Sequence, residues 1–307
     1  MSGYDIRSQF PTLGPIASSL AGACRCIARC LGVAVRRTWR YAVAVLLLLA
    51  VAHGVATLVL GRKVEAELAR LRAEGQPVSA AELAPKPLPD RDNGALIYNR
   101  AFKLIRVAYA DLRDCDLLSA GNRNDPKVWA GARKAVLGNR QALAVAEQAA
   151  AMPGCRFTTN WKAGFGARFP HYGHLVQLAN LAAIRAVVQA RDGDMTGVAR
   201  SVTLILRMSY AIKDDATVIS TLVRGTIIRD AASAISFAAT CGQFSDAQAR
   251  SLAATLSAID LGPSFVNGLE GERAMEQTEL ERIKRNPSYF ASTIMGLGQA
   301  PLPRRIF

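Results

Sequence analysis

Residues 41–60 read YAVAVLLLLAVAHGVATLVL and contain no Asp, Glu, Lys or Arg. As an α-helix with a rise of ~1.5 Å per residue, such a stretch spans about 30 Å, the thickness of the hydrocarbon core of a bilayer. Basic residues flank both ends: Arg37 and Arg40 precede it, and Arg62 and Lys63 follow it. Such flanks are typical of the boundary between membrane and water. The stretch therefore predicts one membrane-spanning helix.

This segment divides the 307-residue chain into unequal parts. We expect a basic cytoplasmic arm over 1–40, the transmembrane helix over 41–60, a helical stalk with a Pro-rich linker over 61–90, a helical domain over 91–285 and a C-terminal tail over 286–307. Hydrophobic residues make up 50% of the chain. The long part is therefore large and apolar enough to fold around a core of its own.

The basic residues near the membrane segment are unevenly placed. Residues 21–40 hold five Arg and no acidic residue, whereas residues 61–80 hold four basic and three acidic residues. Basic flanks stay in the cytoplasm, so we expect the N-terminus there and the domain on the other side of the membrane. An uncleaved anchor fits better than a cleaved signal peptide, because the basic region is long and no clear A-x-A site follows.

The formal net charge of the whole chain is +14. Such an excess could serve anionic lipid or nucleic acid. The basic residues are, however, scattered among acidic ones and lack the interleaved aromatic residues of a nucleic-acid-binding surface. We therefore expect the lipid bilayer and a protein as partners, and no nucleic acid.

Beyond the linker, apolar residues recur at helical spacing, and we find no convincing strand pattern. The first helix of the domain is expected to begin at Asp92 and to continue through Leu112, because apolar residues follow one another at spacings of three and four. Asp125 followed by Pro126 is a second start signal, a capping side chain and then a proline at the first helical position. The helical pattern after it has a break near Gly138.

The remaining helices are expected over 172–191, over 195–213, from Asp214 or Asp215 to Gly242, from Ser245 to Gly262, and from Pro263 to Arg285. The first of them is apolar around most of its circumference, which predicts a central position. Ser245 followed by Gln248 forms a capping box. Helices of this length with short connections predict an all-α fold, with helical hairpins packed as a bundle or as a short tetratricopeptide-like α-solenoid.

Residues 153–171, PGCRFTTNWKAGFGARFPH, interrupt the helical pattern, and we name them the aromatic loop. Phe157, Trp161, Phe165 and Phe169 recur in it every four residues. One interpretation, which we favour, is that the loop packs over the helices as a lid, because burial of such rings is strongly favourable. The other interpretation is a ligand-binding loop.

The candidates for a ligand-binding site are Trp161, His171, His174, Glu272 and Glu276. The two histidines have H-x-x-H spacing near a helix start and could reach one ligand. The two glutamates of the last helix could add carboxylates for acid–base work. The sequence lacks the H-E-x-x-H pattern of zinc enzymes, and glutamate–arginine ladders are common on exposed helix faces. We therefore predict no catalytic residue, no metal site and no cofactor.

A disulfide bond could hold the aromatic loop in place. Cys155 opens the loop, and Cys115 is a better partner than Cys241 because it ends the first predicted helix of the domain. If the domain faces an oxidising compartment, we expect a disulfide between Cys115 and Cys155. Such a bond would close a loop of about forty residues and stabilise the fold by roughly 3–4 kcal/mol.

Three stretches carry a resemblance to known sequences. They are PLPDRDNGALIY at 87–98, CRFTTNW at 155–161 and GER at 271–273. Together with the single anchor, they resemble a group of uncharacterised bacterial proteins that have one N-terminal membrane helix and an all-helical outer domain. The resemblance implies a location in the bacterial envelope, with the domain in the periplasm, and it implies no activity.

Two functions are compatible with this sequence. The first is a membrane-anchored helical interaction or scaffold protein of the bacterial inner membrane. The alternative is an enzyme or small-ligand-binding domain whose site lies under the aromatic loop. Distances distinguish the two, because the alternative requires a histidine of the pair near a carboxylate and a cavity beneath the loop.

Overall fold

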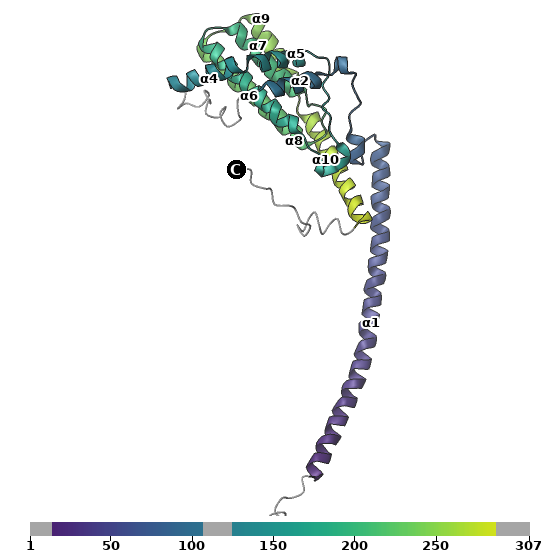
Figure 1. The fold of residues 1–307 in the computed structure, drawn as a ribbon. Helices are drawn as coiled ribbons and strands as arrows, with labels where there is room; N and C mark the ends of the chain where they lie inside the picture. Colours follow the sequence, from purple (N-terminus) through teal and green to yellow (C-terminus); the bar gives the residue numbers. More distant parts are fainter. Residues whose placement is uncertain (1–13, 107–124, 287–307) are drawn as a thin grey trace, which may run out of the picture. The chain divides into compact units, whose positions relative to one another are not determined.

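The computed structural model describes residues 14–106 and 125–286, with side chains from Thr38 onward. Its first element is the helix α1 (Gly14–Ala73), which contains the whole apolar stretch (Figure 1). Thr38–Ala73 is long and apolar enough to cross a membrane, with a mean hydropathy of 2.6 in its most apolar window and none of that window buried. The helix ends just before Gly75, whose positive φ of 74° is readily adopted by a residue without a Cβ.

The chain divides into two compact units, one up to Arg70 and one from Leu71 onward. The second unit consists of helices with short connections (Figure 1). They are α2 (Gly94–Leu104), α4 (Pro126–Gly138), α5 (Arg140–Ala150), α6 (Pro170–Arg191), α7 (Met195–Tyr210), α8 (Val218–Cys241), α9 (Asp246–Ser257) and α10 (Gly262–Arg285), with the 3₁₀ helices η2 (Ala80–Leu83), η3 (Asp90–Asp92) and η4 (Trp161–Gly166). Neither described stretch contains a β-strand, which confirms the all-helical prediction.

Several helix starts follow from their capping residues. The Asp125 side chain accepts a hydrogen bond of 2.8 Å from the backbone of Lys127, and Pro126 occupies the first turn of α4. Ser245 and Gln248 form the predicted capping box of α9. These two starts were predicted correctly because the decisive contacts lie within three residues along the chain.

Two other predicted starts were wrong. The cap of α2 is Asn93, whose side chain accepts a hydrogen bond from Ala95, and not Asp92. The cap of α8 is Thr217, whose hydroxyl accepts from Ser220, and not Asp214 or Asp215. A hydroxyl with extended backbone geometry stands directly before the helix at Thr217, so it outcompetes the earlier carboxylates for the free N–H groups.

The first predicted helix of the domain is also shorter than expected. It ends at Leu104, and Ile105 has an extended backbone with ψ near 125°. The backbone N–H of Arg106 then donates to the side chain of Asn139, a buried residue between α4 and α5, at 2.8 Å. The predicted continuation to Leu112 lies outside the described residues.

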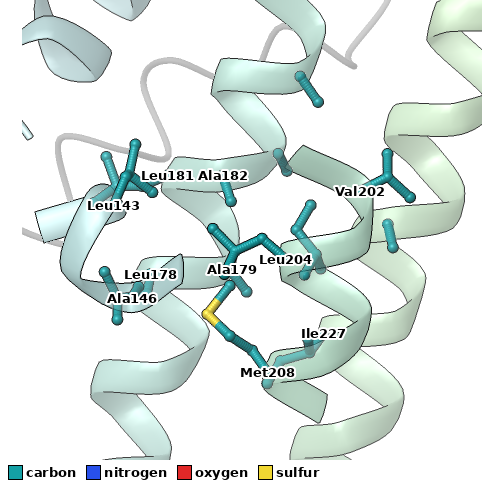
Figure 2. Packing of buried hydrophobic residues seen from close by; sticks show 14 of the residues in the cluster. Leu143, Ala146, Leu178, Ala179, Leu181, Ala182, Val202, Leu204, Met208 and Ile227 are labelled. Carbon is teal, nitrogen blue, oxygen red and sulfur yellow. The ribbon is translucent and has the colours of Figure 1, made fainter. Parts of the chain in front are cut away.

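The central element of the domain is α6, as its apolar circumference predicted. It packs against α7, α8 and α4. Figure 2 shows side chains of α5, α6, α7 and α8 that fill the space between these four helices. Leu178 and Leu181 of α6 are fully buried there beside Leu143 and Met208. Alanines separate the large side chains along α6 and let the neighbouring helices approach closely.

A second, smaller cluster joins α10 to the segments η2 and η4. Its buried members are Ala80, Leu83, Trp161, Ala216, Ala274 and Met275. The backbone N–H of Ala80 donates to the hydroxyl of Thr278 on α10 at 2.8 Å. Residues 71–90, part of the stalk and linker expected over 61–90, therefore pack against α10 and η4 through η2.

The Gly271–Arg273 stretch of α10 holds three parts of this region in place. Gly271 lies against the carbonyl group of Ala216, where a Cβ atom would overlap the carbonyl oxygen. Glu272 accepts a hydrogen bond of 3.1 Å from the backbone N–H of Val218 and so satisfies the start of α8. Arg273 donates to the side chain of Gln76 at 2.9 Å. These contacts give a structural reason for each residue of the stretch.

Candidate functional site

The aromatic loop packs on the helices through three of its four rings. Phe157 and Trp161 are buried, with 9% and 4% of their surface exposed, and Phe169 is partly buried. The fourth ring, Phe165, is 61% exposed. The prediction that most of these rings are folded onto the domain is confirmed.

Four rings from the loop, α2 and α6 form one stacked series. His174 stacks on Phe102 with ring centroids 5.0 Å apart, Phe102 stacks on Phe157 at 6.1 Å, and Phe157 stacks on His171 at 4.2 Å. The two imidazoles therefore stand at opposite ends of the series, separated by two phenyl rings. They are therefore not placed to bind one metal ion together, but both line the same cavity.

That space is a cavity of about 380 Å³ beneath the aromatic loop. Its lining consists of Asn99, Phe102, Lys103, Phe157, Thr158, Pro170, His171 and His174. His174 is exposed and stands at the rim, whereas His171 is buried. Aromatic walls with a few convergent polar groups are typical of small-ligand pockets.

His171 has a carboxylate partner on its far side. Its Nε2 atom lies 3.3 Å from Oδ2 of Asp215, and the hydroxyl of Tyr172 donates to the same oxygen at 3.0 Å. Burial, reinforced by the nearby carboxylate, raises the pKa of Tyr172 far above its usual value, so this phenol remains a neutral donor. The arrangement orients the Nε2 edge of the imidazole toward Asp215, while the ring of Phe157 covers its face.

Trp161 takes no part in lining this cavity. Its indole is buried in the smaller cluster and meets Phe169 edge to face, with centroids 5.4 Å apart. Nearby, Nη1 of Arg282 donates to the carbonyl oxygen of Ala163 at 3.1 Å, and Nη2 donates to that of Lys162. Trp161 thus serves to attach the loop to α10.

The predicted glutamates lie elsewhere. The carboxylate of Glu272 is occupied by the backbone of Val218, as described above, and Glu276 is exposed on α10. The carboxylate that reaches His171 is Asp215, which we had considered only as a helix cap. Its role depends on the packing of α6 beside the start of α8, and nothing in the local sequence signals that contact.

Cys155 is partly buried and carries a free thiol. Burial, with a smaller contribution from Asp215, raises the pKa of this thiol to about 12, so the side chain is protonated at neutral pH. Cys115 lies outside the described residues. The expected disulfide between Cys115 and Cys155 stays a prediction.

A second hollow lies between α5, α7 and α9 and forms a groove of about 520 Å³. Its lining consists of Glu147, Ala150, Thr196, Ala199, Arg200, Thr203, Leu204, Arg207, Ala247, Gln248, Ser251 and Leu252. Glu147 is paired with Arg185, with an N–O distance of 2.7 Å. Arg200 and Arg207 are exposed, and no acidic side chain of the described residues lies within 4.0 Å of either. The groove therefore combines an apolar floor with two uncompensated positive charges.

Among the described side chains, no group of three or more His, Cys, Asp or Glu residues is arranged to hold a metal ion. No protein-family model, no curated protein and no solved structure matches this chain. No activity can therefore be transferred from a relative. What the domain does has to follow from its own cavities and charges.

Proposed function

We propose that this protein is anchored in the bacterial inner membrane by a single crossing of α1, with the N-terminus in the cytoplasm and the helical domain in the periplasm. The uncharged stretch 41–60 supports the crossing, because all but one of its side chains are exposed and would otherwise face water. The arginine excess in 21–40 supports the orientation. In this proposal the helices of the domain form successive hairpins in a short solenoid-like stack.

Reporter fusions test this topology. A reporter that is active only in the periplasm, fused after Phe307, is expected to be active in intact cells. A reporter that is active only in the cytoplasm is expected to be silent at the same position. The reverse pattern would place the domain in the cytoplasm and contradict the proposal.

We further propose that the domain is an interaction module that holds an acidic helical segment of a protein partner in the groove between α7 and α9. The observation that carries this proposal is the pair of uncompensated arginines on one face of α7. Arg200 and Arg207 are seven residues apart, so they lie two helical turns apart at ~10.5 Å. Carboxylates spaced by seven residues on a partner helix would match both charges, while its apolar residues would cover the floor around Leu204.

Charge reversal at both arginines tests this proposal. A photo-crosslinking residue at Thr203 is expected to capture a partner from detergent-solubilised membranes, and Arg200→Glu with Arg207→Glu is expected to abolish the capture. The matched control is Lys127→Glu with Lys134→Glu, an exposed pair with the same spacing on α4. Exchange of the partner's acidic residues for arginine should restore capture by the reversed variant. Equal capture by both double variants would overturn the groove as the docking site.

Small-ligand binding beneath the aromatic loop is a second candidate function. It is supported by the contact between His171 and Asp215 beside a cavity of about 380 Å³. A small-molecule screen by thermal shift, with the full chain in detergent, tests it. Ligands of this cavity should lose their effect in His174→Ala, a change at the exposed rim, and keep it in Glu276→Ala. Hits that are insensitive to His174 would exclude the cavity.

A further inference from the structure

Arg224 is a buried cation with no acidic partner close to it. Its side chain projects from α8 and is 2% exposed. Nε donates to the backbone carbonyl of Ser209 at 3.0 Å, and Nη1 donates to the hydroxyl of Ser264. No acidic side chain of the described residues lies within 4.0 Å of the guanidinium. Buried charges are normally paired, and here the carboxylate of Asp214 acts on the guanidinium only from beyond ion-pair distance.

The guanidinium borders a cavity of about 480 Å³ that is separate from the groove and from the space beneath the aromatic loop. Lys213 and Asn267 line the same cavity, and the ring of Tyr210 lies 5.9 Å from the Arg224 guanidinium. Two hydrogen bonds account for Nε and Nη1. Nη2 donates to no described residue and is left for a ligand.

The start of α10 borders the same cavity. Pro263 and Ser264, in the first turn of this 24-residue helix, line the cavity. The first turn has no acidic residue, and the cap residue, Leu261, makes no side-chain cap hydrogen bond. The backbone N–H of Gly262 already donates to the carboxylate of Asp260 at 2.8 Å, and Pro263 has no N–H, so this helix end is largely satisfied within the chain.

Two acidic side chains also line the cavity, and both are engaged by other groups. Asp214 forms an ion pair with Arg156 at 2.7 Å. Asp260 accepts a hydrogen bond of 2.8 Å from the backbone N–H of Gly262. The lining therefore carries two cations, Lys213 and Arg224, and two carboxylates, of which Asp214 is offset by Arg156 from outside the lining.

We propose that this cavity binds a small organic anion through an oxyanion group, a carboxylate or a phosphate, held by the guanidinium of Arg224 and the ammonium of Lys213. The volume exceeds what an oxyanion group alone requires, so the ligand carries an organic body that lies against Tyr210, Ala258 and Pro263. The site does not depend on the proposed docking groove, because the two share no lining residue.

The test uses the full chain in detergent and three probes of similar shape: phenyl phosphate, benzoate and uncharged benzamide, at constant ionic strength. At least one anion is expected to raise Tm with increasing concentration, and benzamide is not. A response to phenyl phosphate alone assigns a phosphate site, a response to benzoate alone a carboxylate site, and a response to both a general oxyanion site. No response to either anion overturns the proposal.

Two variants separate this site from anion binding elsewhere on a basic protein. Asn267→Asp places a carboxylate in the cavity, so it should raise Tm and abolish the response to the anions. Lys213→Gln should weaken binding about tenfold, the loss expected for one charge-assisted contact. Asn160→Asp, an exposed change of the same charge in the aromatic loop, should leave the response intact. A response that persists unchanged in Asn267→Asp places the anion elsewhere and overturns the assignment.

Discussion

Asp230 shows how burial changes a single charge. Its side chain on α8 is 15% exposed, its Oδ2 atom has no hydrogen-bond partner, and the closest cation is Arg229 at 3.9 Å. Desolvation therefore raises the pKa of this carboxyl to about 6, and Arg229 offsets only part of that effect. The folded protein binds this proton more tightly than the unfolded chain, whose aspartates titrate near pH ~3.9. The contribution of this protonated carboxyl to the free energy of unfolding is fully present below the pKa of the unfolded chain, and it is lost as the pH rises through about 6.

Asp230→Asn is therefore expected to stabilise the protein at pH 7.5. One pKa unit corresponds to ~1.4 kcal/mol, so the gain in the free energy of unfolding is on the order of 1–3 kcal/mol. The variant should also lose the decline in stability between pH 4 and 7 that this carboxyl causes. Urea unfolding followed by circular dichroism at several pH values measures both effects. The exposed Asp90→Asn serves as the control, and an equal gain there would rule out the role of burial.

Leu178 and Glu276 represent the opposite environments of a helix residue. Leu178 is fully buried in α6, whereas Glu276 is exposed on α10. Leu178→Asp is expected to cost several kcal/mol, because it buries an unpaired carboxylate, and to lower Tm strongly or prevent folding. Glu276→Ala should change the free energy of unfolding by about 0–1 kcal/mol. Thermal melts of the two variants test this expectation, and equal melting temperatures would mean that Leu178 does not belong to the hydrophobic core.

At the scale of elements, the contact between α8 and α10 depends on glycine. A Cβ on Gly268 would lie 2.8 Å from the carbonyl carbon of Thr217, and one on Gly271 would overlap the carbonyl oxygen of Ala216. These distances are shorter than van der Waals contact. The start of α8 and the middle of α10 can approach this closely only because both positions lack a side chain.

Gly271→Ala is expected to destabilise the domain by about 2–3 kcal/mol, because the two elements must separate to admit the methyl group. Gly225→Ala is the matched control, since a Cβ at that position of α8 meets nothing within 4 Å. It should stabilise the protein by up to ~1 kcal/mol through the higher helix propensity of alanine. Chemical denaturation measures both free energies of unfolding. A loss of stability in both variants would mean that replacing glycine by alanine is destabilising in itself, and that the close contact at Gly271 is not the cause.

Helix positions were predictable from the sequence where local residues determine them. The start at Asp125 and the capping box at Ser245 depend on contacts within one turn, and both were predicted correctly. The starts of α2 and α8 were misassigned by one to three residues, because neighbouring polar residues compete for the same N–H groups. Which competitor succeeds depends on the backbone geometry, which the sequence pattern does not contain.

The candidate site was predictable only in part, for a similar reason. The spacing of His171 and His174 predicted that both could reach one ligand, which stays a prediction, whereas the density of rings correctly indicated that the aromatic loop is packed. Asp215 and Phe102 complete that region from segments more than forty residues away from His171. Their contribution depends on the packing of α2, α6 and α8, so sequence spacing alone favoured the glutamates of α10 instead.

At the scale of the whole molecule, the domain is expected to fold without its membrane segment. The second compact unit begins at Leu71, and every member of both hydrophobic clusters lies at or beyond Ala80. A chain of residues 71–307 should therefore be soluble without detergent and melt cooperatively, with a Tm close to that of the domain in the full protein. Circular dichroism and size-exclusion chromatography test this expectation. Aggregation or a non-cooperative melt would show that residues before 71 are needed for folding.

Helix α9 buries few side chains, so we expect it to unfold locally more often than the other helices. Leu252 is its buried residue, whereas α6 has thirteen. Local unfolding has its lowest free energy where few side chains are buried, so the backbone amides of α9 should exchange with deuterium at least ~100-fold faster than those of α6. Hydrogen-exchange mass spectrometry measures this difference, and equal protection would contradict it. One wall of the groove therefore opens and closes far more often than the domain unfolds, and an occupant of the groove should be detected first as slower exchange in α9.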